Sequence, residues 1–258
     1  MREEIKDANI IVIKVGTSLL VSPVTGIEEA VISQLASVLS ELIAIGKKPI
    51  LVSSGAVGAG ITQLGEVSKQ TAAAVGQGLV TSRYEAAFNQ QDQTIAQLLL
   101  SREVLEYPKS RHAFVQTLQE LLEHGILPII NENDAVTVDE EGHLAKFEDN
   151  DELSLLVAEA IEADLLIMLS DVNGLYSANP MVNEQATLFR HLSEIDQRLL
   201  EEADSNIGNL SRGGIRSKLK TATGALTANI SMVLANGKSP KVLLDILAGR
   251  EVGTLFKK

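Results

Sequence analysis

Two segments of this chain bring lysine together with glycine, a pairing that suits the binding of phosphate. Lys14 ends an apolar stretch and is followed by the sequence VGTS, and Lys218 closes the sequence GNLSRGGIRSK. Glycine lets the backbone approach a phosphate closely, and lysine supplies a compact positive charge. Both segments could therefore contact a phosphorylated ligand, although Lys14 could also simply extend its ammonium from a strand end into water.

The second of these segments collects three cations in an otherwise acidic protein. Arg212 and Arg216 stand on either side of Gly213 and Gly214, shortly before Lys218. The segment is not a Walker A loop, because Gly214 occupies the position of the required lysine. Cations in the first turns of a helix oppose the helix dipole, so a solvated helix start explains them less well than an anion site.

A run of small residues, SSGAVGAG at 53–60, follows a second apolar stretch. Small residues before a helix leave backbone N–H groups open to an anion. The same glycines would also suit close packing of a helix on the sheet. Their order is not the G-x-G-x-x-G of dinucleotide-binding folds, so a nicotinamide-dependent dehydrogenase is disfavoured.

Four polar residues, NEND at 131–134, come directly after the apolar segment 128–130. Amide and carboxylate groups at a strand end can hydrogen-bond an amino-acid ligand and pair with its ammonium group. An Asx turn is the simpler alternative, because Asn and Asp also favour turns. The cluster is nevertheless richer in polar groups than a turn requires.

An acidic run, EDNDE at 148–152, stands immediately before an expected helix. One of its residues can cap the helix, and acids suit the first helical turn. Capping does not explain all five. Carboxylates in a phosphate site can also orient lysines or hold Mg²⁺, which prefers oxygen ligands.

One further strand end carries polar residues, and the histidines are isolated in the sequence. Ser170 and Asp171 follow another strand and lead into an Asn-Gly turn, which could be an ordinary surface turn. The four histidines are scattered and fit no zinc-protease or hydrolase motif. No residue therefore stands out as a general base.

The apolar periodicity indicates which elements position these loops. Strands are expected near 10–15, 49–53, 95–100, 126–130, 165–169 and 230–234. Helices are expected near 31–43, 71–91, 110–124, 151–161 and 215–228. This alternation predicts an α/β fold with a mainly parallel sheet covered by helices on both faces. Ligands bind beyond the carboxyl ends of such strands, and a hairpin is expected over that site at 135–147.

Composition limits the class of protein. The chain has 258 residues, 45% of them hydrophobic, and no linker-like tract, so we expect one domain spanning 1–258. The absence of cysteine excludes disulfides and thiol catalysis, and no apolar run is long enough for a signal peptide or a membrane span. We therefore expect a soluble cytoplasmic protein with no membrane partner. A net charge of −12 opposes binding to nucleic acid.

Taken together, the motifs resemble those of the glutamate 5-kinases, a branch of the amino acid kinase superfamily. The shared segments are 12–18, 52–56, 74–77, 131–134, 149–151 and 213–218, in the same order along essentially the whole chain. The NEND and DND segments are the most specific to that branch. Many members also carry a C-terminal PUA domain, which we do not expect in this chain.

The resemblance implies a fold and a reaction. The fold would be a three-layer αβα sandwich with a mainly parallel central sheet. The enzyme would transfer phosphate from ATP, with Mg²⁺, to the γ-carboxylate of L-glutamate, making γ-glutamyl phosphate in the first step of proline biosynthesis. Feedback inhibition by proline and a homo-oligomer, either dimer or tetramer, would accompany that role.

The resemblance also implies a role for individual residues. Lys14 and Lys218 would stabilise the transferring phosphoryl group, and Asp151 would orient both lysines. Glutamate would be held by Ser54, Asp134, Asn150 and Asn131. The nucleotide would contact Lys14, Ser170, Asp171, Arg212, Gly213, Gly214, Ile215, Arg216, Ser217 and Lys218. No side chain is implied as a direct metal ligand.

Two other functions are compatible with a similar set of motifs. A sibling kinase acting on acetylglutamate, aspartate, carbamate or UMP would change only the acceptor, and the segment 131–134 argues against it. A non-catalytic amino acid sensor would keep the pocket without turnover. The presence of Lys14, Asp151 and Lys218 argues against a sensor.

Overall fold

The computed structural model of this protein describes residues 2–137, 147–178, 180, 183, 185–196, 199–200 and 214–258. The strands are β1 (Ile10–Val15), β2 (Val21–Ser22), β3 (Gly26–Ile27), β4 (Lys48–Val52), β5 (Ile95–Leu100), β6 (Leu127–Glu132), β7 (Leu165–Ser170), β8 (His191–Leu192), β9 (Ser231–Asn236) and β10 (Thr254–Phe256). The helices are η1 (Arg2–Asp7), α1 (Thr17–Leu20), α2 (Glu29–Ala44), α3 (Ala56–Leu64), α4 (Lys69–Asn89), α5 (Arg102–Glu106), α6 (Pro108–Glu123), α7 (Asn150–Ala160), α9 (Gly214–Thr227) and α10 (Val242–Leu247).

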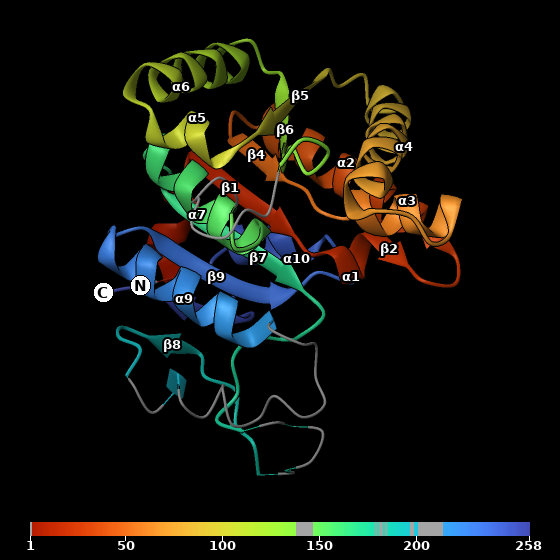
Figure 1. The fold of residues 1–258 in the computed structure, drawn as a ribbon. Helices are drawn as coiled ribbons and strands as arrows, with labels where there is room; N and C mark the ends of the chain where they lie inside the picture. The colour runs from red at the N-terminus through yellow and green to blue at the C-terminus, as the bar shows by residue number, and fades with distance from the viewer. Residues whose placement is uncertain are drawn as a thin grey trace.

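Eight of the described strands form one central sheet, in the order β5-β6-β4-β1-β7-β9-β10-β8 (Figure 1). Neighbouring strands run parallel except at β10, which is antiparallel to β9. The predicted α/β fold with a mainly parallel sheet is therefore confirmed. No helix among the described residues combines the length and the apolar character that a bilayer crossing requires.

The alternation of side chains along each strand divides the core into two layers. Ile11 and Ile13 of β1 belong to the apolar cluster that includes α2 and α4, whereas Val12 belongs to the cluster that includes α6, α7 and α9. Successive side chains of a strand point to opposite faces, so a strand that is apolar throughout must be covered on both sides. The result is the expected three-layer arrangement of helix, sheet and helix.

Several element boundaries differ from the sequence-based prediction, and two of them affect the site. β6 continues through Asn131 and Glu132, which the sequence analysis placed after the strand. They remain in the strand because they pair with Leu99 and Leu100 of β5. α3 begins at Ala56, whereas the prediction kept the whole of 53–60 as a loop.

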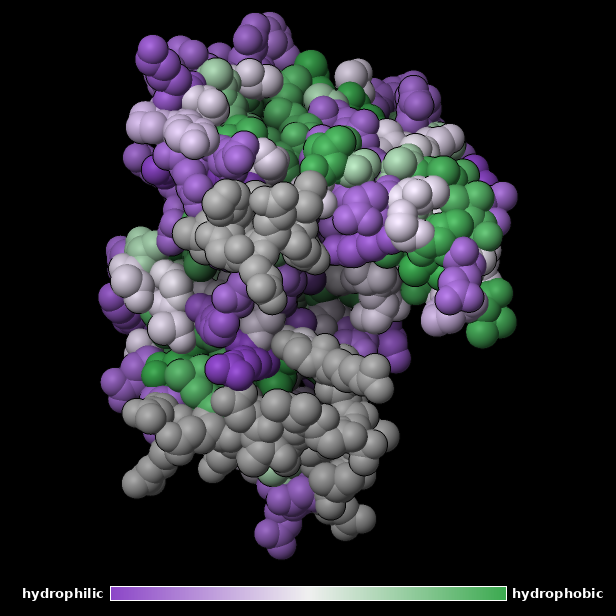
Figure 2. All heavy atoms as spheres, viewed as in Figure 1, coloured by the Kyte–Doolittle hydropathy of each residue, from purple (hydrophilic) through white to green (hydrophobic). Residues whose placement is uncertain are grey.

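Close contact between α3 and α4 depends on glycine. A Cβ at Gly60 would lie 1.9 Å from the carbonyl oxygen of Ala72, and one at Gly76 would lie 1.7 Å from that of Ala56. Any larger residue would force the helices apart, so the close-packing interpretation of these small residues is correct for Gly60, with a helix as partner in place of the sheet. Hydrophobic residues gather over α3 on the face shown in Figure 2. Ile61 of α3 is one of the exposed large hydrophobic residues.

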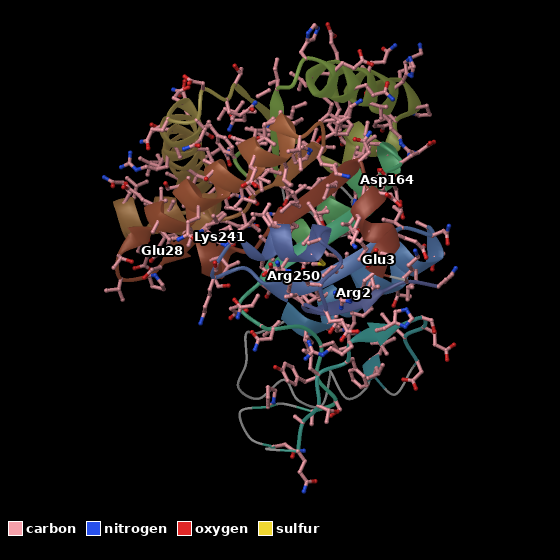
Figure 3. All side chains as sticks on the ribbon, turned by 180° about the vertical axis from the view of Figure 1, so that it is seen from behind. Arg2, Glu3, Glu28, Asp164, Lys241 and Arg250 are labelled. Carbon is pink, nitrogen blue, oxygen red and sulfur yellow. The ribbon has the colours of Figure 1, made fainter. Side chains whose placement is uncertain are left out.

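Hydrogen bonds and an ion pair connect the N-terminal residues to the C-terminal part of the chain. The guanidinium of Arg2 donates to the carbonyl oxygens of Val252 at 2.7 Å and Gly253 at 3.1 Å, on the face seen from behind (Figure 3). Lys257 forms an ion pair with Glu4. Both ends of the chain therefore meet beside the same part of the sheet.

Candidate active site

A cleft of about 660 Å³ opens beyond the carboxyl ends of β1, β4 and β6. It is lined by these strand ends and by the first turns of α1, α3, α4, α7 and α9. In Figure 1, α3 and α4 lie on one side of this edge of the sheet and α9 on the other. The predicted site residues that line it are Lys14, Ser54, Asn131, Asp134, Asn150, Asp151, Gly214 and Lys218.

One end of the cleft contains a buried carboxylate between two lysines. Lys14 Nζ lies 2.5 Å from Asp151 Oδ1, and Lys218 Nζ donates to Asp151 Oδ2 at 3.3 Å. Burial on its own would raise the pKa of Asp151, but the charges and hydrogen bonds of the two lysines outweigh it and hold that pKa below its ordinary value. The carboxylate is therefore ionised at neutral pH, and the trio has one positive charge in excess.

The three residues of this trio belong to three different elements that meet at one end of the cleft. Lys14 is the penultimate residue of β1, and Asp151 lies in the first turn of α7. Asp149 caps α7 by accepting from the N–H groups of Asp151 and Glu152, so the capping interpretation is correct for that one residue of the acidic run. Lys218 lies one turn into α9, where its ammonium also donates to the carbonyl of Gly214 at 3.0 Å.

A network of amide side chains forms the wall on the side of β4 and β6. Asn150 Nδ2 lies within hydrogen-bonding distance of Ser54 Oγ at 2.8 Å and Asn131 Oδ1 at 3.1 Å. Asn131 in turn donates through Nδ2 to Gln77 Oε1 at 2.8 Å. Because each amide nitrogen is engaged with an oxygen, the orientation of both asparagine side chains is fixed.

A separate ion pair marks the rim of the cleft farther from β1. Lys69 Nζ lies 3.0 Å from Asp134 Oδ1. Asp134 follows β6, and Lys69 is the first residue of α4. The lysine was not identified in the sequence analysis, although it lines the cleft together with the predicted Asp134.

The start of α3 supplies backbone groups between these two charged regions. Gly55 has a φ of 93°, a conformation that strongly favours glycine, and a Cβ there would lie 2.9 Å from Val21 Cγ2. This turn brings the first residues of α3 to the cleft, where the early N–H groups of a helix have no partner within the helix. The arrangement can therefore accept a small anionic ligand with phosphate at one end.

Comparison with known proteins assigns this geometry to a family. A family model described as "Amino acid kinase family" matches residues 9–236, which include Lys14, Asp151 and Lys218. The chain belongs to the amino acid kinase family. This membership confirms the resemblance that the sequence motifs predicted.

Three similar sequences are those of glutamate 5-kinases. A glutamate 5-kinase of Enterococcus faecalis is 46% identical over 100% of this amino acid kinase and 98% of its own length. A glutamate 5-kinase of Lactiplantibacillus plantarum is 45% identical over 95% of this chain and 96% of its own. The glutamate 5-kinase of Listeria innocua is 42% identical over 99% and 95%.

Solved structures support the fold at much lower identity. The isopentenyl phosphate kinase of T. acidophilum superposes with a TM-score of 0.66 at 17% identity, over 96% of this chain and 100% of that one. The UMP kinase of Bacillus anthracis gives a TM-score of 0.64 at 16% identity, over 97% and 96%. The predicted amino acid kinase fold is thus confirmed.

Most of the described residues that were predicted to contact the nucleotide in this amino acid kinase do not line the cleft, unlike the residues predicted to hold glutamate. Ser170 ends β7 and donates to Asp171 Oδ1 at 3.1 Å, but neither residue lines the cleft. Ile215, Arg216 and Ser217 lie in the first turn of α9 and do not line it either. Arg212 and Gly213, like most of the expected hairpin at 135–147, lie outside the described residues.

Two polar residues of α4 at or near the cleft had no assigned role in the sequence analysis. Gln77 belongs to the segment 74–77 that supports the family resemblance, but only the folded structure brings it against Asn131. Lys69 gives one sequence signal, because it is a cation in the first turn of a helix that has no acidic residue there.

Proposed function

We propose that this amino acid kinase transfers the terminal phosphate of ATP to the γ-carboxylate of L-glutamate. The observation that supports this most strongly is the arrangement of Lys14, Asp151 and Lys218 at one end of a cleft whose other end carries amide and carboxylate groups. Glutamate 5-kinases that align with nearly the whole chain support the choice of acceptor.

In this proposal the two lysines stabilise the phosphoryl group as it moves. Charge develops on its oxygens during in-line transfer, so catalysis needs positioning and neutralisation more than covalent help. Asp151 keeps both ammonium groups aimed at the same point, because its two oxygens pair with Lys14 and Lys218 separately. The excess positive charge of this trio suits an incoming anion.

The acceptor would lie along the amide wall with its γ-carboxylate toward Lys14. Ser54, Asn131 and Asn150 would hold it by hydrogen bonds, and Asp134 would pair with its ammonium group. A glutamate γ-carboxylate is already ionised at neutral pH, since its reference pKa is about 4.3. The reaction therefore requires no general base.

The nucleotide would lie toward β7 and α9, in contact with Ser170, Asp171 and the segment 212–218. Mg²⁺ would arrive on its phosphates and neutralise part of their charge. The described residues contain no cluster of three or more histidine and carboxylate side chains suited to a metal, and both oxygens of Asp151 face lysines. These residues fit an ion that is held mainly by the nucleotide.

The test is the formation of an acyl phosphate. Wild type with MgATP and L-glutamate should release ADP and, with hydroxylamine present, yield the γ-hydroxamate. Lys218→Ala should lower this rate by roughly 10²- to 10³-fold, because a charge aimed at the transition state is removed. Lys220→Ala, on the same helix but paired with Glu148 at the surface, serves as the matched control.

The outcomes separate the alternatives. Hydroxamate that depends on glutamate and disappears in Lys218→Ala supports the proposal. Turnover with another acceptor but not with glutamate would favour a sibling kinase. Nucleotide binding without any ADP release would favour a sensor.

We further propose from family kinship that the enzyme works in the cytoplasm as a homo-oligomer and that proline inhibits it. Light scattering of the purified protein would give its oligomeric state. An unchanged rate of hydroxamate formation at millimolar proline would contradict the proposed inhibition.

A further inference from the structure

We infer that Lys69 binds the α-carboxylate of the acceptor and thereby selects for an α-amino acid. The inference rests on the proposed function and adds a specificity residue to it. It starts from the ion pair between Lys69 and Asp134 at the rim of the cleft.

The position of Lys69 in α4 is unfavourable for a lysine with no other role. It is the first residue of the helix, where the helix dipole repels a positive charge. The helix is already capped by Ser68, whose Oγ accepts from the N–H of Thr71 at 3.2 Å. The lysine is therefore not needed as a cap, and its ammonium contacts Asp134 at the cleft.

The two partners of this pair differ in their access to solvent. The side chain of Asp134 is 14% exposed, whereas that of Lys69 is 47% exposed. The lysine can therefore turn toward a ligand while the carboxylate stays in place. Because nearly half of its side chain is exposed, the ammonium of Lys69 stays in contact with water as it turns from Asp134 toward a ligand.

A zwitterion matches such a pair. The ammonium group of an amino acid would face Asp134, and its α-carboxylate, attached to the same carbon, would face Lys69. Each of the four charges then has an opposite neighbour, and none is left unpaired in the partly desolvated cleft.

Lys69 is the third lysine among the described residues that line the cleft, and it lies at the end where Asp134 stands. The other two, Lys14 and Lys218, both face Asp151. β4 lies between β1, which carries Lys14, and β6, which Asp134 follows. Two strand spacings correspond to about 10 Å, so the two ends of one small acceptor can reach different cations.

The experiment compares two acceptors that differ only at the α-carboxyl group. L-Glutamate and its α-amide, isoglutamine, both present an ammonium group and a γ-carboxylate, and both would yield a γ-hydroxamate. The ratio of their kcat/KM values measures recognition of the α-carboxylate. We expect wild type to favour glutamate by roughly 10- to 100-fold, as for the loss of one hydrogen bond to a charged group.

Lys69→Met should reduce this preference to within about threefold, because the change lowers kcat/KM for glutamate and leaves the α-amide nearly unaffected. Lys69→Arg should restore most of the preference, since it retains the charge. Lys6→Met is the matched control, because Lys6 has a 43% exposed side chain and is paired at 2.6 Å with Glu3, which Figure 3 labels on the face seen from behind. The control should keep the wild-type ratio.

Three results would contradict the inference. If Lys69→Met lowers kcat/KM for both acceptors by the same factor, the lysine has only a structural role through Asp134. If Lys69→Met leaves kcat/KM for both acceptors at the wild-type values, another group recognises the α-carboxylate. Absence of hydroxamate from wild type and glutamate would instead overturn the proposed function, and this inference with it.

Discussion

The two ends of the cleft hold their polar groups by different means. At the end near β6, neutral amides are linked in sequence from Asn150 to Asn131 to Gln77, across three separate elements. At the end near β1, two lysines share the single carboxylate of Asp151. The first arrangement fixes direction, since hydrogen bonds between amides depend on angle. The second supplies charge to a group that moves during the reaction.

This difference predicts that substitutions at the two ends of the cleft will change different kinetic constants. Loss of charge near β1 should affect mainly kcat, because that charge acts on the transition state. Loss of a hydrogen bond near β6 should affect mainly the KM for glutamate, because that bond positions the bound acceptor.

The largest effect is expected at Asp151. Asp151→Asn removes the negative charge that separates two ammonium groups, so Lys14 and Lys218 would repel each other and leave their aligned positions. We expect kcat to fall roughly 10²- to 10³-fold with a glutamate KM within a few-fold of wild type. Glu159→Gln, which neutralises another carboxylate of α7, is the control in the same steady-state assay. An unchanged kcat for Asp151→Asn would remove the distinction between the two ends.

The second-largest effect is expected for a substitution at the contact between α3 and α4. Gly76→Ala would place a Cβ 1.7 Å from the carbonyl oxygen of Ala56, at the start of α3. We expect a loss of about 1–3 kcal/mol in the free energy of unfolding, measured by denaturant titration, and a raised KM for glutamate but not for ATP.

Gly78→Ala is the matched control in the same helix. No atom lies within 4 Å of a Cβ built there, so the substitution should stabilise the protein by about 0.5–1 kcal/mol through the unfolded state. If both alanine variants had the same stability, the steric account of the helix contact would be wrong.

A smaller effect is expected at Gln77. Gln77→Leu removes the acceptor for Asn131 Nδ2, so that this amide can turn and release Asn150. The glutamate KM should rise roughly tenfold while the ATP KM stays constant. Gln93→Leu changes a residue that donates to the carbonyl oxygens of Thr94 and Gly125, before the start of β5, and should leave both constants unchanged. Equal changes in the two KM values would argue against a positioning role.

The smallest effect concerns acid stability. The pKa of Asp151 is lowered in the folded protein, so its contribution to stability is complete above the ordinary value of 3.8. That contribution is lost as the pH falls below this value through the folded-state pKa. Wild type should therefore lose more stability than Asp151→Asn as the pH is lowered below the ordinary value of 3.8, as measured by urea unfolding. Parallel stability curves for the two proteins would contradict the assigned charge pairing.

Much of the phosphate end could be predicted from the sequence because its groups adjoin regular elements. Lys14 lies near the end of an apolar strand and Asp151 lies in the first turn of a helix, and parallel strands bring such positions to one edge of the sheet. The same logic predicted Asn131 and Asp134, although β6 extends farther than its apolar run because β5 pairs with its polar end.

The remaining features depend on contacts that no local pattern encodes. Gln77 and Lys69 belong to α4, whose close approach to α3 requires glycine at two positions. β10 has three residues, too few for any periodicity, and it is defined by its antiparallel pairing with β9. Local propensity determines elements, whereas such placements follow from packing over long sequence distances.

The bonds of Arg2 and Lys257 have a consequence for the connectivity of the fold. β1 starts at the edge of the sheet that holds the amino ends of the parallel strands, and the antiparallel β10 ends at that same edge, opposite the cleft. The N-terminal and C-terminal segments are therefore close together there, where Arg2 and Lys257 connect them. A short peptide could bridge the distance between the N-terminal segment at Arg2 and the C-terminal segment at Lys257. New termini opened at the exposed turn of Asp92, which also lies at that edge between α4 and β5, would give a circular permutant with the cleft undisturbed.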